Sequence, residues 1–236
     1  MQLFYSPNIQ EDDKKIIFSK DESKHITKVL RKKEGDILKV TNGKGFLFSA
    51  EIITVNANQC LAKIVDYQLQ PKPDYHLHMA VAPTKMNDRF EYFLEKATEI
   101  GIHEITPIIC EHSERKVVKL NRYERVLQSA MKQSLHFRIP ILNQPVQFKD
   151  FVKNAKLTSN FIAHCEEDGD KNYFQNLITA KSDICILIGP EGDFSKTEID
   201  AALTQGWKPV SLGDTRLRTE TAAVVACHTV ALKNQI

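Results

Sequence analysis

The chain has 236 residues, of which 42% are hydrophobic and 26% are charged, an ordinary balance for a globular protein. The net charge of +2 is unevenly spread, because residues 112–140 carry seven basic side chains against two acidic ones. Residues 1–72 are also basic, with 12 Lys and Arg against 9 Asp and Glu. Such clusters are typical of a surface that binds a polyanion, although a solvated helix face gives the same pattern.

Cysteine usage and the N-terminus indicate the compartment. The five cysteines are scattered, with no C-x-x-C pair and no histidine at metal-ligand spacing. They are therefore predicted to be reduced thiols, with neither disulfides nor a metal site. The first 15 residues lack a basic leader followed by an apolar run, and no apolar run is long enough to cross a bilayer. We expect a cytoplasmic protein that makes no use of a membrane.

The N-terminal part is predicted to be rich in β-structure. A short helical patch at 23–31 precedes strands at 37–40, 46–53 and 60–65, and an Asn-Gly turn joins the first two strands. Short strands joined by tight turns favour a small barrel. Two prolines in residues 70–74 predict a stiff linker. The expected division is a barrel domain over residues 1–70 and a second domain over residues 71–236.

Beyond the linker, strands alternate with helices. Strands are predicted at 77–82, 105–109, 160–163, 184–188 and 210–212. The first helix should stop at Gly101, a later one should start with a capping box at Ser195, and the last should cover 219–232. This alternation predicts an α/β domain with a largely parallel sheet and helices on both faces. Pro107 suggests that its strand lies at an edge or ends there.

A glycine-rich turn follows the strand at 184–188. It reads Gly189-Pro190-Glu191-Gly192 and leads into the capped helix. Ligands of open α/β sheets bind beyond the carboxyl ends of the strands, and glycines let backbone amides approach a ligand closely. A tight strand-to-helix turn without a ligand would look similar. The turn is neither a dinucleotide fingerprint nor a P-loop.

A second polar segment, residues 211–223, follows the last predicted strand. It contains Gly213, Arg216, Arg218 and Glu220 immediately before a helix. Charged groups at a strand end can hold and polarise a substrate. The plainer interpretation is a surface ion pair between Arg218 and Glu220, with Thr219 capping the helix.

Residues 188–195 and 217–222 closely resemble motifs of the ribosomal RNA small subunit methyltransferase E family, which belongs to the SPOUT superfamily. Residues 25–36, 85–107, 113–115 and 133–140 are similar to further parts of that family, in the same order. The resemblance covers nearly the whole chain. One departure is Thr215-Arg216-Leu217-Arg218, where the family usually has Arg-Ile-Leu-Arg.

The resemblance implies a SPOUT-type trefoil-knotted parallel sheet preceded by a PUA-like β-barrel, in a homodimer. It implies S-adenosylmethionine-dependent methylation of N3 of a uridine in the decoding region of 16S rRNA, within the small ribosomal subunit. DNA is not expected as a partner. Two alternatives stay open. One is a methyltransferase of the same superfamily that acts on another RNA or on a ribose hydroxyl. The other is a non-catalytic RNA-binding assembly factor. A nucleotide-binding oxidoreductase is disfavoured because the dinucleotide fingerprint is missing.

The resemblance also implies site residues. Arg218 would stabilise charge on the uracil carbonyls, and Glu220 would orient that arginine or accept the proton. His164 could contact the cofactor or be a structural histidine. Arg89 could pair on the surface with Glu91 or Glu95, so it is left out of the site. The residues expected to bind the cofactor are Ala163, His164, Ile188, Gly189, Pro190, Glu191, Gly192, Ser211, Leu212, Gly213, Arg216, Leu217 and Thr221. The residues expected to contact RNA phosphates are Arg31, Lys32, Arg115, Arg122 and Arg138.

Overall fold

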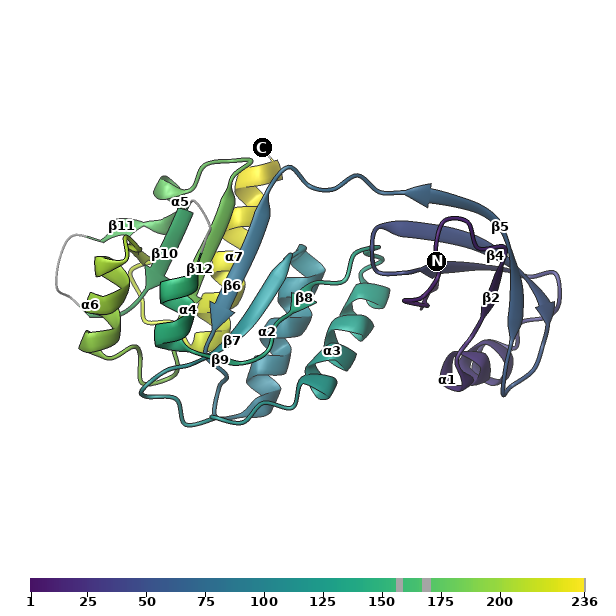
Figure 1. The fold of residues 1–236 in the computed structure, drawn as a ribbon, viewed down its shortest axis with the longest axis horizontal. Helices are drawn as coiled ribbons and strands as arrows, with labels where there is room; N and C mark the ends of the chain where they lie inside the picture. The colour runs from purple at the N-terminus through teal and green to yellow at the C-terminus, as the bar shows by residue number, and fades with distance from the viewer. Residues whose placement is uncertain (156–158, 167–170, 236) are drawn as a thin grey trace. The chain divides into compact units, whose positions relative to one another are not determined.

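The computed structural model describes residues 1–155, 159–166 and 171–235 (Figure 1). The chain forms two compact units. The first comprises Met1–Lys72 together with Gln128–Ile139, and the second comprises Pro73–Leu127 together with Pro140–Ile236. The second segment of the first unit begins inside helix α3 (Leu120–Gln133).

A five-stranded sheet with the order β1-β3-β4-β5-β2 builds the first unit. Its pairs are antiparallel except for β1 with β3. The β3–β4 hairpin turns through the predicted Asn-Gly sequence, where Gly43 and Gly45 take φ values of +73° and +104°. The strands are β1 (Leu3–Tyr5), β2 (Lys15–Ile17), β3 (Ile37–Thr41), β4 (Phe46–Thr54) and β5 (Leu61–Leu69).

Apolar side chains from every strand fill the core of this unit. Phe4, Leu38 and Phe48 are almost fully buried in it, and Ile26 joins them from the helical segment. That segment consists of α1 (Lys20–Lys24) and the π-helical turn η1 (His25–Val29). Register shifts in the β4–β5 pairing bend β4 along its length, as bulges do in curved sheets. The result is a curled five-stranded sheet, where the sequence predicted a small barrel.

An eight-stranded sheet builds the second unit, as the alternating pattern predicted. The order is β11-β13-β10-β12-β6-β7-β8, with β9 also paired to β7, and every pair is parallel. The strands are β6 (His76–Val81), β7 (Glu104–Ile109), β8 (Ile141–Leu142), β9 (Val146–Gln147), β10 (Ser159–Ala163), β11 (Asn172–Tyr173), β12 (Asp183–Ile188) and β13 (Lys208–Ser211).

Helices cover both faces of this sheet (Figure 1). Alternate residues of β12 point to opposite faces, and Cys185 and Leu187 lie in one apolar cluster with α4 and α6. On the other face α7 packs against β6, β12 and α2. The helices are α2 (Asn87–Ile100), α4 (Phe148–Asn154), α5 (Phe174–Leu177), α6 (Lys196–Thr204) and α7 (Thr219–Gln235).

Pro107 occupies a gap in the hydrogen-bonding edge of β7. On one side β7 pairs with β6 along Glu104–Pro107. Because β8 and β9 pair with its other side, β7 is not at the edge of the sheet. On the other side β8 pairs only with Glu104 and Ile105, and β9 only with Ile108 and Ile109. The proline, which has no N–H to donate, therefore sits where two short partner strands meet.

Two features of the fold position the site. Because β6, β10, β12 and β13 are parallel, the loops after them emerge at the same edge of the sheet. Helix α2 ends at Gly101 with φ of +106°, and α6 begins with the predicted capping box, in which Ser195 and Glu198 satisfy one another's backbone amides.

Within the described part of the chain, every helix is too short or too polar to cross a membrane.

Candidate functional site

Two adjoining cavities lie at the carboxyl ends of β10, β12 and β13. Their volumes are about 330 and 430 Å³, which lies in the range of small-molecule sites. The residues that line both cavities are Ala163, Cys165, Arg216, Leu217 and Ala222. The shared lining shows that the two cavities adjoin, with Arg216 and Leu217 in the wall of both, and we refer to them together as the cleft.

Most of the expected cofactor residues line this cleft. Gly192 and Thr221 are the two that do not: Gly192 packs against the Cβ of His112, and Thr221 is exposed on the first turn of α7. Glu191 accepts a hydrogen bond from the backbone N–H of Lys85, at 2.9 Å, which joins the loop after β6 to the cleft. The expected residues in the lining are Ala163, His164, Ile188, Gly189, Pro190, Glu191, Ser211, Leu212, Gly213, Arg216 and Leu217.

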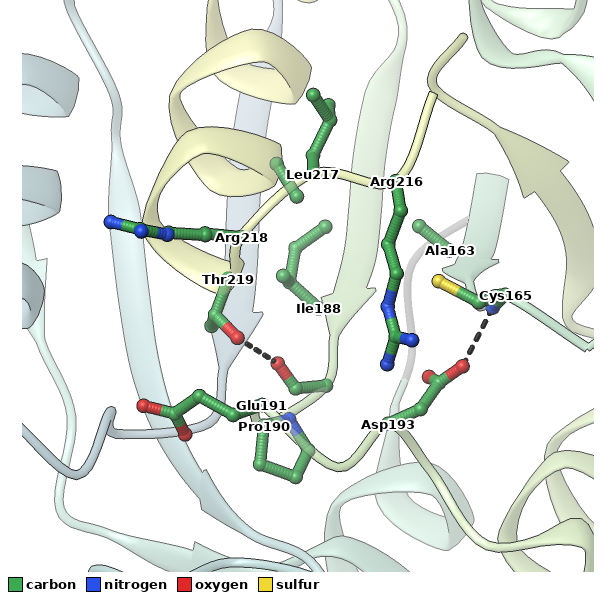
Figure 2. Close-up of a pocket in the computed structure, with 12 residues that line it drawn as sticks. Ala163, Cys165, Ile188, Pro190, Glu191, Asp193, Arg216, Leu217, Arg218 and Thr219 are labelled. Atoms are coloured by element: carbon green, nitrogen blue, oxygen red, sulfur yellow. Dashed lines mark hydrogen bonds between the residues drawn. The ribbon is translucent and has the colours of Figure 1, made fainter. Parts of the chain in front are cut away.

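Contacts of Gly189 and Asp193 shape the loop after β12. A Cβ at Gly189 would lie 3.1 Å from the Phe194 ring, so this position has little room for a side chain. Asp193, at φ of +61°, accepts hydrogen bonds from the backbone N–H groups of Phe194 (2.8 Å) and Cys165 (2.7 Å). The Cys165–Asp193 bond, drawn in Figure 2, ties the loop after β10 to the loop after β12.

The loop after β13 is tied to the same place. The hydroxyl of Thr219 donates to the carbonyl oxygen of Gly189 at 3.0 Å. Figure 2 shows the Arg216 side chain reaching across the cleft toward Asp193, whereas Arg218 points to the other side of the loop. Arg216 and Arg218 both line the first cavity. The two arginines flanking Leu217 therefore offer positive charge to different parts of the cleft.

His164 is the most unusual polar group in the cleft. Both ring nitrogens are buried, and neither has a hydrogen-bond partner among the residues that the structure describes. Burial lowers the pKa of His164, and the ammonium of Lys171, which donates to the His164 carbonyl at 2.9 Å, lowers it further. A neutral imidazole has one N–H donor and one acceptor, and leaving both unpaired costs free energy.

Glu220 also lacks a full set of partners. It is 8% exposed, and its Oε1 lies 3.9 Å from Nε of Arg89. Its Oε2 is buried and without a hydrogen-bond partner within the described ranges. The surface ion pair that the sequence offered as an alternative, between Arg218 and Glu220, is therefore replaced by a partly buried pair with Arg89. Thr219, which the sequence suggested as a helix cap, donates its hydroxyl to the carbonyl oxygen of Gly189.

The residues expected to contact RNA fall in both units. In the second, Arg115 donates to the carbonyls of Thr84 (2.9 Å) and Lys85 (2.7 Å), and Arg122 forms an ion pair with Glu91. In the first, the residues are Arg31, Lys32 and Arg138. Arg31 is exposed with φ of +52°, and Lys32 lies 3.9 Å from Asp36. Arg138 donates to the carbonyls of Lys44 (2.7 Å) and Gln70 (2.5 Å).

Sequence reasoning missed several lining residues. Asp193 and Thr219 lie inside the two motifs, so their position already signalled them. Cys165 was not missed: the family resemblance implies a cofactor loop at Ala163-His164-Cys165, and Cys165 lines both cavities. Lys171 carries no local signal, because only the pairing of β11 with β13 brings its segment to the cleft.

Comparison with known proteins agrees with this geometry. Residues 70–231 match the family model of an RNA methyltransferase domain, and residues 18–65 match that of an RNA methyltransferase PUA domain. A ribosomal RNA small subunit methyltransferase E of Rickettsia conorii is 30% identical over 98% of this chain and 95% of its own length.

Solved structures agree as well. A protein of Porphyromonas gingivalis, described as a probable rRNA methyltransferase, is 39% identical, with a TM-score of 0.92 over 100% of this chain and 99% of that one. A Legionella pneumophila protein, described as a methyltransferase and solved with its cofactor S-adenosylmethionine, is 30% identical, with a TM-score of 0.88 over 98% and 97% of the two chains. The fold is that of an RNA methyltransferase with a PUA domain. The chain belongs to the ribosomal RNA small subunit methyltransferase E family.

Proposed function

We propose that this protein methylates N3 of a uridine in the decoding region of 16S rRNA, within the small ribosomal subunit, using S-adenosylmethionine. One observation carries the proposal: the two family motifs, residues 188–195 and 217–222, meet at a single ligand-sized cleft on an RNA methyltransferase domain. The same proposal includes the trefoil knot, a homodimer and a cytoplasmic location, as the family resemblance implies.

The cleft fits S-adenosylmethionine. Ile188, Leu217 and Ala222 offer an apolar surface for the adenine ring, and His164 lines the adjoining cavity. Close packing against Phe194 leaves no room for a side chain at position 189. The glycine lets the backbone of this loop approach the ligand closely. When bound, S-adenosylmethionine supplies a methyl group activated by its positively charged sulfur.

Arg218 and Glu220 are the residues to which we assign the chemistry at the target base. Uracil N3 carries a proton that must leave before or as the nitrogen gains the methyl group, and negative charge then spreads onto the neighbouring carbonyls. Arg218, exposed on the cleft wall, would stabilise that charge. Glu220 would orient Arg218 or accept the proton, directly or through water. Its Oε2 is buried, so proton transfer requires this side chain to turn toward the cleft.

The RNA would be held mainly through its phosphates. In the barrel domain, expected over residues 1–70, Arg31 and Lys32 are the proposed contacts. Arg122 would add a contact from the methyltransferase domain, expected over residues 71–236. Arg115 and Arg138 already bind backbone carbonyls, so at these two positions a structural role competes with the proposed RNA contact. The target base is expected to leave its stack, since N3 lies on its pairing edge.

The decisive experiment is methyl transfer from labelled S-adenosylmethionine to small ribosomal subunits that lack the modification. The product nucleoside would be identified by chromatography and mass spectrometry. We expect labelled 3-methyluridine from 16S rRNA, and Arg218→Ala and Glu220→Ala proteins that fold but turn over poorly.

Other products would contradict parts of the proposal. A different methylated nucleoside, or label in another RNA, would keep the methyltransferase and replace its substrate. Cofactor binding without transfer to any RNA would contradict the assigned substrate. Absence of both binding and transfer would favour the RNA-binding assembly factor.

A further inference from the structure

Arg89 stands apart from the other charged residues at the start of α2. Its neighbours on the helix already have partners: Glu91 binds Arg122, and Glu95 binds Lys96 at 2.7 Å. The surface pairing of Arg89 with Glu91 or Glu95 that the sequence suggested is therefore not formed. Instead, Nε of Arg89 lies 3.9 Å from Oε1 of Glu220, on the first turn of α7.

The Glu220 carboxylate lies in the first turn of α7, where the helix N-terminus favours negative charge, and Arg89 is the cation paired with it. Its side chain is 10% exposed, and that of Arg89 is 37% exposed, so the pair sits at the border of the protein interior. A carboxylate at such a place is costly unless a cation and hydrogen bonds support it. At 3.9 Å the Arg89 contact is an ion pair without a hydrogen bond, and Oε2 has no partner among the described residues.

Helix α2 also begins beside the cofactor loop. The loop that leads into α2 donates from the Lys85 N–H to Glu191, and the Arg115 guanidinium binds the Thr84 and Lys85 carbonyls. The start of α2 is thereby tied to the turn after β12. Arg89 therefore approaches Glu220 from a segment whose position is linked to the cleft.

We propose that Arg89 is a positioning residue for methyl transfer: its guanidinium holds the Glu220 side chain in the orientation that the reaction requires. This inference rests on the proposed function. Arg89 acts through Glu220, so it should affect the transfer step more than cofactor binding. Lysine can replace the charge but not the planar, forked set of donors, so it should substitute only in part.

The test is a double-mutant cycle on single-turnover methyl transfer, with saturating S-adenosylmethionine and unmodified small subunits. The proteins are wild type, Arg89→Gln, Arg89→Lys, Glu220→Gln and the Arg89→Gln/Glu220→Gln double variant. We expect Arg89→Gln to slow transfer by about 10- to 100-fold, because misplacing a catalytic group by about 1 Å has effects of this size. Arg89→Lys should recover part of the rate, and the Kd for S-adenosylmethionine should stay close to that of wild type.

The double variant decides between positioning and general structure. If Arg89 acts through Glu220, the double variant transfers no more slowly than Glu220→Gln alone. Lys96→Ala, which breaks an ion pair on the same helix away from the cleft, should retain the wild-type rate. The inference would be overturned if the rate losses of the two single variants multiplied in the double variant, or if Arg89→Gln transferred at the normal rate. Either result would leave the proposed function intact. An inactive wild type would overturn the proposed function itself, and the inference with it.

Discussion

At Gly189 the backbone of the cofactor loop passes against an aromatic ring. A Cβ there would contact both the ring and the backbone nitrogen of Phe194, at 3.1 and 3.3 Å, and Phe194 is itself buried. Gly189→Val should therefore displace the loop, at a cost typical of overpacking, and raise the Kd for S-adenosylmethionine about tenfold or more. Isothermal titration would measure the change, with Thr204→Val, a valine introduced at an exposed position of α6, as the control. Unchanged affinity in Gly189→Val would show that the loop does not form the cofactor site.

Single residues also mark the limit of sequence reasoning. Gly189 and Arg218 could be found because they belong to short motifs with a local signal. Arg89 could not, since its partner Glu220 is on a different helix and its sequence neighbours offer more obvious acids. His164 was ambiguous for the same reason: whether its ring nitrogens are satisfied depends on what the fold places around them.

At the scale of elements, Glu104 links three neighbouring strands. It accepts hydrogen bonds from His76 on β6 (2.9 Å) and from Asn143, just after β8 (2.6 Å). The hydrogen bond from His76 lowers the pKa of Glu104 to about 2 from its ordinary value of 4.5, and Asn143 contributes to the shift. The folded state thus binds fewer protons than the unfolded chain between these two pH values.

This linkage predicts a pH-dependent stability. The contribution of Glu104 is fully present above pH 4.5 and is lost as the pH falls toward 2, because protonation then favours the unfolded chain. Its upper limit is about 3 kcal/mol, from the free-energy equivalent of a pKa shift of this size. Urea unfolding at pH 6 and pH 3 should show wild type losing more stability than Glu104→Gln. Identical losses would mean that Glu104 carries no such linkage.

At the scale of the whole molecule, residues far apart in the chain complete the first unit. The segment Gln128–Ile139 lies in that unit although it follows much of the methyltransferase domain in sequence. Arg138 anchors it by donating to carbonyls at the β3–β4 turn and just after β5, and a Cβ on Gly45 would overlap its guanidinium. The domain division expected from the proline-rich linker contains no signal for this association.

Two arginines of this unit should respond differently to the same change. Arg138→Gln should destabilise the protein by about 1 kcal/mol, since it removes two hydrogen bonds from a charged donor to backbone carbonyls of exposed residues. Arg31→Gln should leave the melting temperature unchanged but weaken RNA binding, with a shallower dependence of log Kd on log salt. Calorimetry and RNA titrations at several salt concentrations would separate the two roles. A stable Arg138→Gln protein with a reduced salt slope would instead assign Arg138 to the RNA.

Local patterns in the sequence determined the classes of structure and the principal motifs. Periodicity and turn residues specify strands and helices because they depend on neighbours in the chain, so the parallel sheet, the curled N-terminal sheet and both cleft loops could be predicted. The tertiary structure alone decided which side chains meet: Lys171 at the cleft, Arg89 at Glu220, Arg138 at the β3–β4 turn, and Pro107 between two short strands. Such contacts join residues with no local signal in common, and only burial and pairing across the fold bring them together.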